Sequence, residues 1–151
     1  MYVSRAAPGI TPEDVKRLAH RAAENNARRQ VTGLLAYNSV SFMQLLEGDG
    51  AAVLDTMRVI ESDTRHSGIT YIRQDNRDKR ECPDWSMRSL LTPLAGVKSA
   101  TVFTGTLPPE MELDTKILFT SFASALTPEQ ARHHAEQMEQ VMEQRSRPGN
   151  D

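Results

Sequence analysis

The fold of this 151-residue chain is decided by residues 31–48, VTGLLAYNSVSFMQLLEG. Two runs rich in apolar residues, 31–37 and 41–47, flank a short polar connection at Asn38-Ser39. That pattern predicts a β-hairpin. Because side chains alternate along a strand, Gln44 shares a face with Phe42 and Leu46. The hairpin therefore predicts a sheet that carries one amide within an otherwise apolar face.

The residues before the hairpin predict a strand followed by a helix. Residues 2–4 are extended in character, and Thr11-Pro12-Glu13-Asp14 has the pattern of a capping box with proline in the first helical turn. Apolar residues then recur at helical spacing as far as about Asn26. They are Val15, Leu18, Ala19, Ala22 and Ala23.

The residues after the hairpin complete the pattern. Asp49-Gly50 opens a second predicted helix, with Val53, Leu54, Met57 and Ile60 on one face, and Gly68 marks a break before a strand at 69–72. A charged loop at 74–81 leads to a last short strand at about 85–90. The order β-α-β-β-α-β, with one further strand, predicts an α+β, ferredoxin-like sheet with two helices on one face.

We expect residues 1–92 to form this domain and residues 93–151 to form a linker and a helical extension. Leu107-Pro108-Pro109 marks a break, and residues 117–126 predict a short buried helix. Thr127-Pro128-Glu129-Gln130 repeats the capping pattern and predicts a longer helix to about Arg145. These helices are expected to cover the second face of the sheet.

Composition limits the functional class. Eighteen basic and twenty acidic residues give a net charge of −2, which indicates neither a nucleic-acid nor a membrane partner. The single cysteine, Cys82, excludes an internal disulfide and is typical of a reducing compartment. No apolar run approaches the roughly 20 residues that span a bilayer. We therefore expect a cytoplasmic protein.

Three polar residues fall at positions that the pattern places in the interior. Asn26 lies eleven residues after Val15, at nearly the same helical azimuth, while Gln44 and Tyr2 lie on predicted strands. Taken singly, each is most simply a core polar group bonded to backbone or water. Taken together, two amides and a phenol are typical of a pocket for a polar, planar ligand, since an amide offers both donors and an acceptor.

Five motifs in order resemble those of the BLUF family, the blue-light sensors that use FAD. They are Asn25-Asn26-Ala27-Arg28, Val31-Thr32-Gly33-Leu34-Leu35, Phe42-Met43-Gln44-Leu45-Leu46-Glu47-Gly48, Asp63-Thr64-Arg65-His66 and Pro83-Asp84-Trp85-Ser86-Met87. The resemblance covers roughly residues 1–90. It implies a non-covalently bound FAD, whereas spacing alone leaves FAD and FMN open.

The resemblance also implies the photoactive residues. Tyr2 matches the tyrosine that gives an electron and a proton to the excited flavin. Gln44 matches the glutamine between that phenol and the flavin ring, whose hydrogen bonds rearrange after excitation. Trp85 and Met87 match the pair that relays the change into the last strand. Members of the family carry a few more residues before this tyrosine. We therefore expect either that the true start lies further upstream or that the first strand is short and holds Tyr2 less firmly.

The cofactor-binding residues follow from the same resemblance. Asn26, with Asn25 nearby, matches the asparagine that fixes one edge of the ring. Asp63, Arg65 and His66 lie where the family holds the ring rim and the ribityl-phosphate chain.

We therefore expect a blue-light photoreceptor that is not an enzyme, forms a homo-oligomer and signals to a downstream protein partner. One alternative is a light-independent flavin-binding interaction module on the same scaffold. Another is a small ferredoxin-like enzyme such as an acyl-phosphate hydrolase, for which Arg5 and Gly9 near the first strand–helix turn are weak support.

Overall fold

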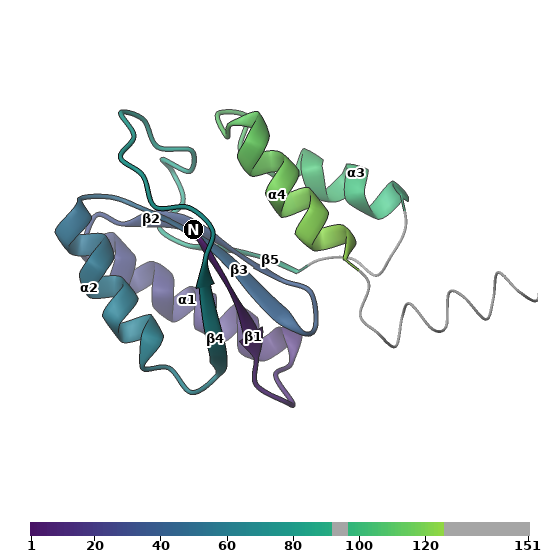
Figure 1. Cartoon of the computed structure of the whole chain (residues 1–151), viewed down its shortest axis with the longest axis horizontal. Helices are drawn as coiled ribbons and strands as arrows, with labels where there is room; N and C mark the ends of the chain where they lie inside the picture. Colours follow the sequence, from purple (N-terminus) through teal and green to yellow (C-terminus); the bar gives the residue numbers. More distant parts are fainter. Residues whose placement is uncertain (92–96, 126–151) are drawn as a thin grey trace, which may run out of the picture.

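The computed structural model describes residues 1–91 and 97–125 as nine elements of secondary structure (Figure 1). In chain order these are β1 (Tyr2–Ala6), α1 (Pro12–Arg28), β2 (Thr32–Tyr37), β3 (Ser41–Glu47), α2 (Gly50–Glu61), β4 (His66–Tyr71), β5 (Arg88–Leu91), α3 (Val97–Gly105) and α4 (Leu113–Ser124).

The five strands form one sheet in the order β4-β1-β3-β2-β5. The first four pair antiparallel in the ferredoxin-like order, and β5 adds to the edge parallel to β2. Tyr2 pairs with Gln44 across β1 and β3, and Gln44 pairs with Leu35 across β3 and β2. The predicted α+β fold is confirmed, and its central strands carry the two polar residues picked out by the sequence.

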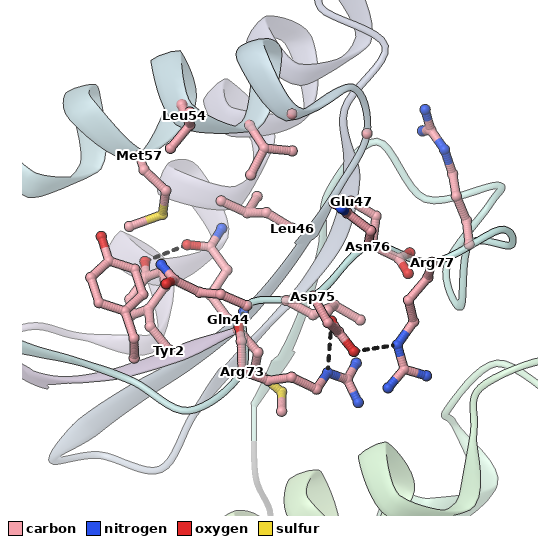
Figure 2. A pocket seen from close by; sticks show the side chains of 18 of the residues that line it. Tyr2, Gln44, Leu46, Glu47, Leu54, Met57, Arg73, Asp75, Asn76 and Arg77 are labelled. Carbon is pink, nitrogen blue, oxygen red and sulfur yellow. Dashed lines mark hydrogen bonds and ion pairs between the residues drawn. The ribbon is translucent and has the colours of Figure 1, made fainter.

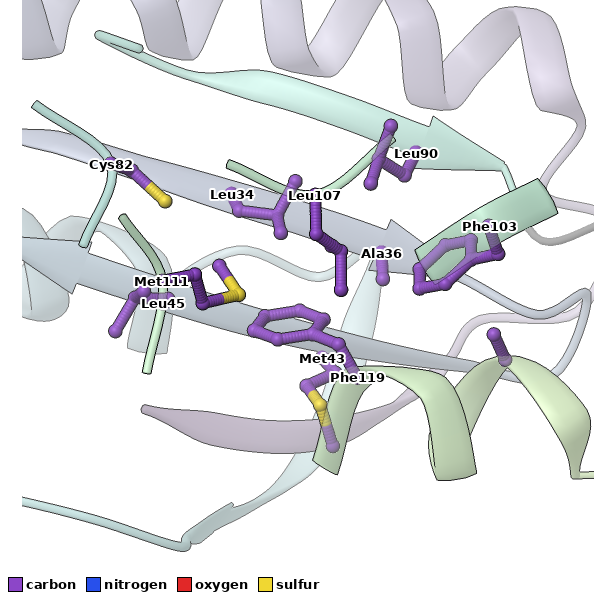
Figure 3. Packing of buried hydrophobic residues seen from close by; sticks show 11 residues of the cluster. Leu34, Ala36, Met43, Leu45, Cys82, Leu90, Phe103, Leu107, Met111 and Phe119 are labelled. Carbon is purple, nitrogen blue, oxygen red and sulfur yellow. The ribbon is translucent and has the colours of Figure 1, made fainter. Parts of the chain in front are cut away.

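The helices cover the two faces of the sheet in pairs (Figure 1). Helix α1 packs on one face around Val15, Ala19, Leu35, Phe42 and Met87. Helices α3 and α4 cover the opposite face (Figure 3), where a second apolar cluster joins strand residues to helical ones. That cluster contains Leu34, Ala36, Met43, Leu45, Cys82, Leu90, Phe103, Leu107, Met111, Phe119 and Ala123.

The hairpin forms as predicted, and two features of its sequence explain why. Asn38 Oδ1 accepts hydrogen bonds from the backbone of Val40 at 3.2 Å and of Ser41 at 2.9 Å, which closes the turn. Gly33 lies so close to β3 that a Cβ there would meet Leu45 O at 2.1 Å. Only glycine allows β2 and β3 to approach in this way.

Helix α1 begins as predicted and ends two residues later than predicted. The Thr11 hydroxyl accepts from Asp14 N at 3.2 Å, and the Asp14 carboxylate accepts from Thr11 N at 2.9 Å. The helix continues to Arg28 and stops before Gln30, whose φ of 54° no helix accommodates.

Two strand boundaries differ from the prediction. Strand β4 begins at His66, earlier than the predicted strand at 69–72. Gly68 does not precede the strand but lies inside it, with a φ of 63° beside an irregularity in the pairing with β1. Strand β5 begins only at Arg88. Trp85 precedes it in a turn, where its N–H donates to Cys82 O at 3.3 Å and its carbonyl accepts from Gly33 N at 2.7 Å.

The C-terminal part contains an unpredicted helix, α3, and a helix α4 that lies a few residues earlier than the predicted 117–126. Helix α4 buries Thr115, Phe119 and Ala123, while Ile117 is exposed. The predicted domain boundary at residues 92 and 93 and the helix predicted from Thr127 lie outside the described residues. None of the helices in the described part of the chain is long and apolar enough to cross a membrane.

Candidate functional site

Tyr2 and Gln44 form a buried hydrogen-bonded pair at the centre of the sheet. They face each other in the β1–β3 register, and only 4% and 5% of their surfaces are exposed. The Tyr2 hydroxyl donates a short hydrogen bond to Gln44 Oε1. Burial, helped by the charge of Asp63, raises the pKa of Tyr2 well above its ordinary value. The phenol therefore keeps its proton at neutral pH.

The other end of the Gln44 amide faces Met87. Gln44 Nε2 lies 3.5 Å from Met87 Sδ, a weak N–H···S contact. The remaining amide hydrogen of Gln44 has no hydrogen-bond acceptor among residues 1–91 and 97–125. The amide is thus fixed by Tyr2 and only loosely held by the sulfur, so it has donor capacity left for a ligand.

Asn26 is buried on α1 and also has unused capacity. Its Nδ2 donates to Ser86 O at 2.9 Å, while no described residue donates to its Oδ1. Every fully buried side-chain oxygen in the described structure has a hydrogen-bond partner. Because the Asn26 Oδ1 has none, this atom is not fully buried. Ser86 and Met87 are adjacent, and their segment therefore contacts both Asn26 and Gln44. Asn25, by contrast, is exposed.

His66 supports Tyr2 from β4. Its Nε2 lies 2.8 Å from Ile60 O and its Nδ1 lies 2.9 Å from Ser4 Oγ. Since a carbonyl only accepts, Nε2 carries the proton and the Ser4 hydroxyl donates to Nδ1. The ring stacks beside Tyr2 at 6.3 Å between centroids and meets Phe42 edge-on. His66 is thus held by Ser4 and Ile60 and packs beside the phenol.

A cavity of about 660 Å³ opens beside the pair, between α2 and the sheet (Figure 2). Tyr2 and Gln44 lie at one side of it, beneath Met57 and Leu54 of α2. Leu54 remains 58% exposed although it points toward the sheet, which indicates that α2 lacks a packing partner there. The far rim is formed by the charged loop that follows β4, residues 73–80. A cavity of this size, apolar beneath α2 and polar along the loop, is large enough for a small molecule that has both apolar and polar parts.

Arg65 lines a separate cavity of about 350 Å³ near the first half of α1. Its other lining residues are Ile10, Asp14, Arg17 and Arg21, so three guanidinium groups surround one opening. Arg65 is held by Asp63 at 2.5 Å, and this hydrogen bond lowers the pKa of Asp63. Arg17 also pairs with Asp14 at 2.5 Å. Because the cavity has three arginines and one carboxylate, its lining still suits an anionic group such as a phosphate.

The sequence-predicted residues therefore fall into two main groups. Gln44 contacts both Tyr2 and Met87. Asn26 bonds to the Ser86 carbonyl next to Met87, whereas Asp63, Arg65 and His66 lie between the end of α2 and the start of β4.

Trp85 stands apart from these groups. It packs against the cluster beneath α3 and α4 and stacks under Arg88, whose guanidinium carbon lies 4.5 Å from the ring centroid.

Sequence reasoning missed three contributors to the site. Arg17 and Arg21 were not singled out from the sequence, although their i, i+4 spacing places them together on α1. The loop at 73–80 was recognised as charged, but nothing in its composition indicated that it would border the cavity. Only the fold brings that loop beside Gln44.

Comparison with known proteins assigns this geometry to a family. A model of "Sensors of blue-light using FAD" matches residues 1–88, which is more than half of the chain. The chain belongs to the BLUF family. The prediction from the five motifs is thereby confirmed, together with FAD as the cofactor by which this family is defined.

Individual relatives agree with the family assignment. Residues of this BLUF protein are 29% identical over 89 positions to the photoactivated adenylate cyclase subunit beta of Euglena gracilis, covering 58% of this chain. The match spans about 10% of the length of that relative.

Solved structures share the fold. BlrB, a BLUF protein in its dark state, is 28% identical, with a TM-score of 0.62 over 83% of this chain and 93% of BlrB. Klebsiella pneumoniae BlrP1, solved with FMN and cyclic diGMP, is also 28% identical, with a TM-score of 0.67 over 81% of this chain and 33% of that one.

The residues of this BLUF protein fit FAD. The unused donor of Gln44 and the unused acceptor of Asn26 match a heterocycle edge that bears both N–H and C=O groups. The arginines near Asp14 match a diphosphate.

Proposed function

We propose that this BLUF protein is a blue-light photoreceptor in which the Tyr2–Gln44 pair converts excitation of FAD into a change of hydrogen bonds. The observation that carries the proposal is the buried bond from the Tyr2 hydroxyl to Gln44 Oε1, with the rest of the amide facing Met87. When bound, FAD supplies light absorption and, once excited, a strong electron acceptor.

The protein side of the reaction follows from the geometry. Tyr2 is the electron donor, and its proton lies on the hydrogen bond to Gln44 Oε1. The Gln44 amide has two arrangements of nearly equal volume, because rotation by half a turn exchanges its oxygen and its nitrogen. In one the oxygen faces Tyr2, and in the other the NH₂ group does. Such a two-state element is what a switch requires.

Rotation of the Gln44 amide has an optical consequence. In the rotated arrangement Gln44 makes a stronger hydrogen bond to a ring carbonyl, which stabilises the excited state more than the ground state. The absorption of FAD therefore shifts to the red after illumination. Met87 senses the same rotation through its sulfur and leads directly into β5, from which the signal passes to the C-terminal helices and a downstream protein partner.

The test is the absorption spectrum of the FAD-loaded protein before and after blue light, in the unsubstituted protein and in Gln44→Leu. Leucine keeps the volume and removes the amide, so the red shift should disappear while FAD remains bound. Met57→Leu is the matched control, because it changes a cavity-lining residue without removing a hydrogen-bond partner, and it should keep the shift.

A red shift that survives in Gln44→Leu would overturn the proposed role of the amide. An unsubstituted protein that binds FAD without any red shift would instead favour the light-independent interaction module. The two failures are thus distinguished by the same spectra.

A further inference from the structure

A buried carboxylate joins the charged loop to the start of α4. Glu81 is only 2% exposed. Its Oε1 accepts from Arg73 Nη2 at 2.5 Å, and its Oε2 accepts from the backbone N–H of Glu112 at 3.2 Å. Arg73 donates from Nη1 to the hydroxyl of Thr115 at 2.8 Å, and Thr115 is fully buried in α4. We call Arg73, Glu81 and Thr115 the α4 anchor.

The same arginine also contacts the photoactive side of the sheet. The Met1 nitrogen donates to Arg73 O at 2.7 Å, and Arg73 N donates to Met1 O at 3.2 Å. Met1 immediately precedes Tyr2, and Arg73 lines the cavity that Tyr2 and Gln44 border (Figure 2). The backbone of Arg73 therefore follows β1, while its side chain holds α4.

The strand that carries Gln44 reaches the anchor as well. Glu47 ends β3, three residues beyond Gln44. Its carboxylate accepts from the backbone N–H of Glu81 at 2.7 Å and of Cys82 at 2.8 Å. Both central strands, and so both members of the photoactive pair, are connected to the anchor within a few residues.

Arg73 also pairs with Asp75 at 3.6 Å and with Asp114 at 3.4 Å, and Glu81 also pairs with Arg77 at 3.7 Å. Of these four ion pairs, Arg73–Glu81 is the shortest and the most buried. Arg77 also pairs with Asp75 at 2.8 Å and contacts Glu112, but both acids are more than 40% exposed. Exposed pairs of this kind hold their partners weakly. In the anchor the charges lie away from water, where leaving one partner unpaired is costly. A displacement of Arg73 must therefore either move α4 or break the anchor.

We infer that Arg73, Glu81 and Thr115 are positioning residues that couple the Tyr2–Gln44 pair to α4, so that the signal reaches α4 through the ends of β1 and β3. This inference rests on the proposed function, and it provides a connection separate from that through Met87 and β5. It predicts that α4 responds to light only while the anchor is intact.

The experiment compares hydrogen–deuterium exchange of residues 113–124 in the dark and under blue light in the FAD-loaded protein. Thr115→Val removes the hydroxyl that accepts from Arg73 and keeps the shape, while Thr115→Ser is the matched control that keeps the hydroxyl. Glu81→Gln is a second, independent variant that removes the charge. Neither position lines the cavity, so all variants should keep FAD and the red shift.

We expect light to alter exchange in α4 of the unsubstituted protein and of Thr115→Ser. In Thr115→Val and Glu81→Gln, exchange in α4 should be faster in the dark, and the light-induced change should fall by at least threefold. A full light-induced change in both of these variants would overturn the coupling. So would an unsubstituted protein that shows the red shift without a response in α4. An unsubstituted protein that shows no red shift would overturn the proposed function itself.

Discussion

The face of the sheet beneath α1 and α2 carries Tyr2, Ser4 and Gln44 among its buried residues. Beneath α3 and α4 the strands bury apolar side chains, and the buried polar residues Glu81 and Thr115 lie at the start of α4. On the first face, α2 buries only Thr56 and Met57 along its whole length and borders a cavity of about 660 Å³. On the second face, eleven buried residues pack into one cluster (Figure 3).

The difference indicates that the two faces of the sheet have different roles, one in the stability of the fold and one in binding the cofactor. Close apolar packing supplies most of the free energy of folding, so the α3–α4 face is expected to dominate stability. Polar groups with unused hydrogen-bonding capacity reduce stability until a ligand satisfies them, so the α1–α2 face is expected to depend on FAD. The following changes test that contrast.

The largest effect is expected from Phe119→Ala on the α3–α4 face. Phe119 is fully buried, so truncation should lower the free energy of unfolding by about 3–5 kcal/mol. Urea unfolding measures the loss, and the absorption maximum of bound FAD should stay unchanged. Ile117→Ala on the exposed side of the same helix should cost under ~0.5 kcal/mol. A loss below ~1 kcal/mol for Phe119→Ala would contradict the contrast.

FAD should have the next largest effect, and it should act through the other face. At a concentration of about 100 times its Kd, a ligand that binds only the folded state stabilises it by about 2.7 kcal/mol. Thermal unfolding with and without FAD measures the gain. Because the two faces are separate, the gain should be the same in Phe119→Ala as in the unsubstituted protein. A gain that depends on Phe119 would show that the faces are coupled.

Asn26→Ala should have an intermediate effect. It leaves the Ser86 carbonyl without its donor, which should cost about 1–2 kcal/mol, and it removes the Oδ1 that we expect to meet FAD. Urea unfolding and FAD titration measure the two losses. The neighbouring Asn25→Ala is the matched control, since Asn25 is exposed and should change stability by under ~0.5 kcal/mol. Weaker FAD binding in Asn25→Ala would support its predicted contact with the cofactor.

Tyr2→Phe should have the smallest effect at neutral pH, about 1 kcal/mol, because it removes one hydrogen bond and leaves Gln44 Oε1 without its donor. The difference in the free energy of unfolding between Tyr2→Phe and the unsubstituted protein should change at alkaline pH. Burial raises the pKa of Tyr2 in the folded state above the unfolded value of about 10, so the folded state resists losing this proton. The unsubstituted protein should therefore lose stability as pH rises above about 10, and Tyr2→Phe should lose less. Urea unfolding between about pH 7 and pH 11 measures both slopes; equal slopes would contradict the buried phenol.

The pattern of apolar and polar residues was enough to predict the main helices and strands of the domain. Alternation in residues 31–48, the capping box at Thr11 and the turn at Asn38 are local signals, and each formed as predicted. The ends of elements were less predictable. Gly68 was predicted to mark the break between α2 and the next strand, yet it lies inside β4. The pairing with β1 is irregular there and tolerates a glycine with a left-handed backbone conformation.

The site was predicted in part. Burial of Tyr2, Asn26 and Gln44 followed from helical and strand periodicity, and the resemblance to the BLUF family indicated their roles. The expected weak hold on Tyr2 is not what the structure describes, since β1 pairs on both sides and the phenol is 4% exposed. The roles of the individual residues remain predictions until the variants above are measured.

The sequence by itself determined which residues face inward, because side-chain alternation and helical spacing are properties of a short segment. It also determined the family, since the five motifs keep their order. Only the tertiary structure decided which segments meet. The contacts of Gln44 with Met87 and of Glu81 with Arg73 and Glu112 join residues far apart in the chain or on different elements. Such contacts depend on how the elements pack, and no local pattern of residues encodes that packing.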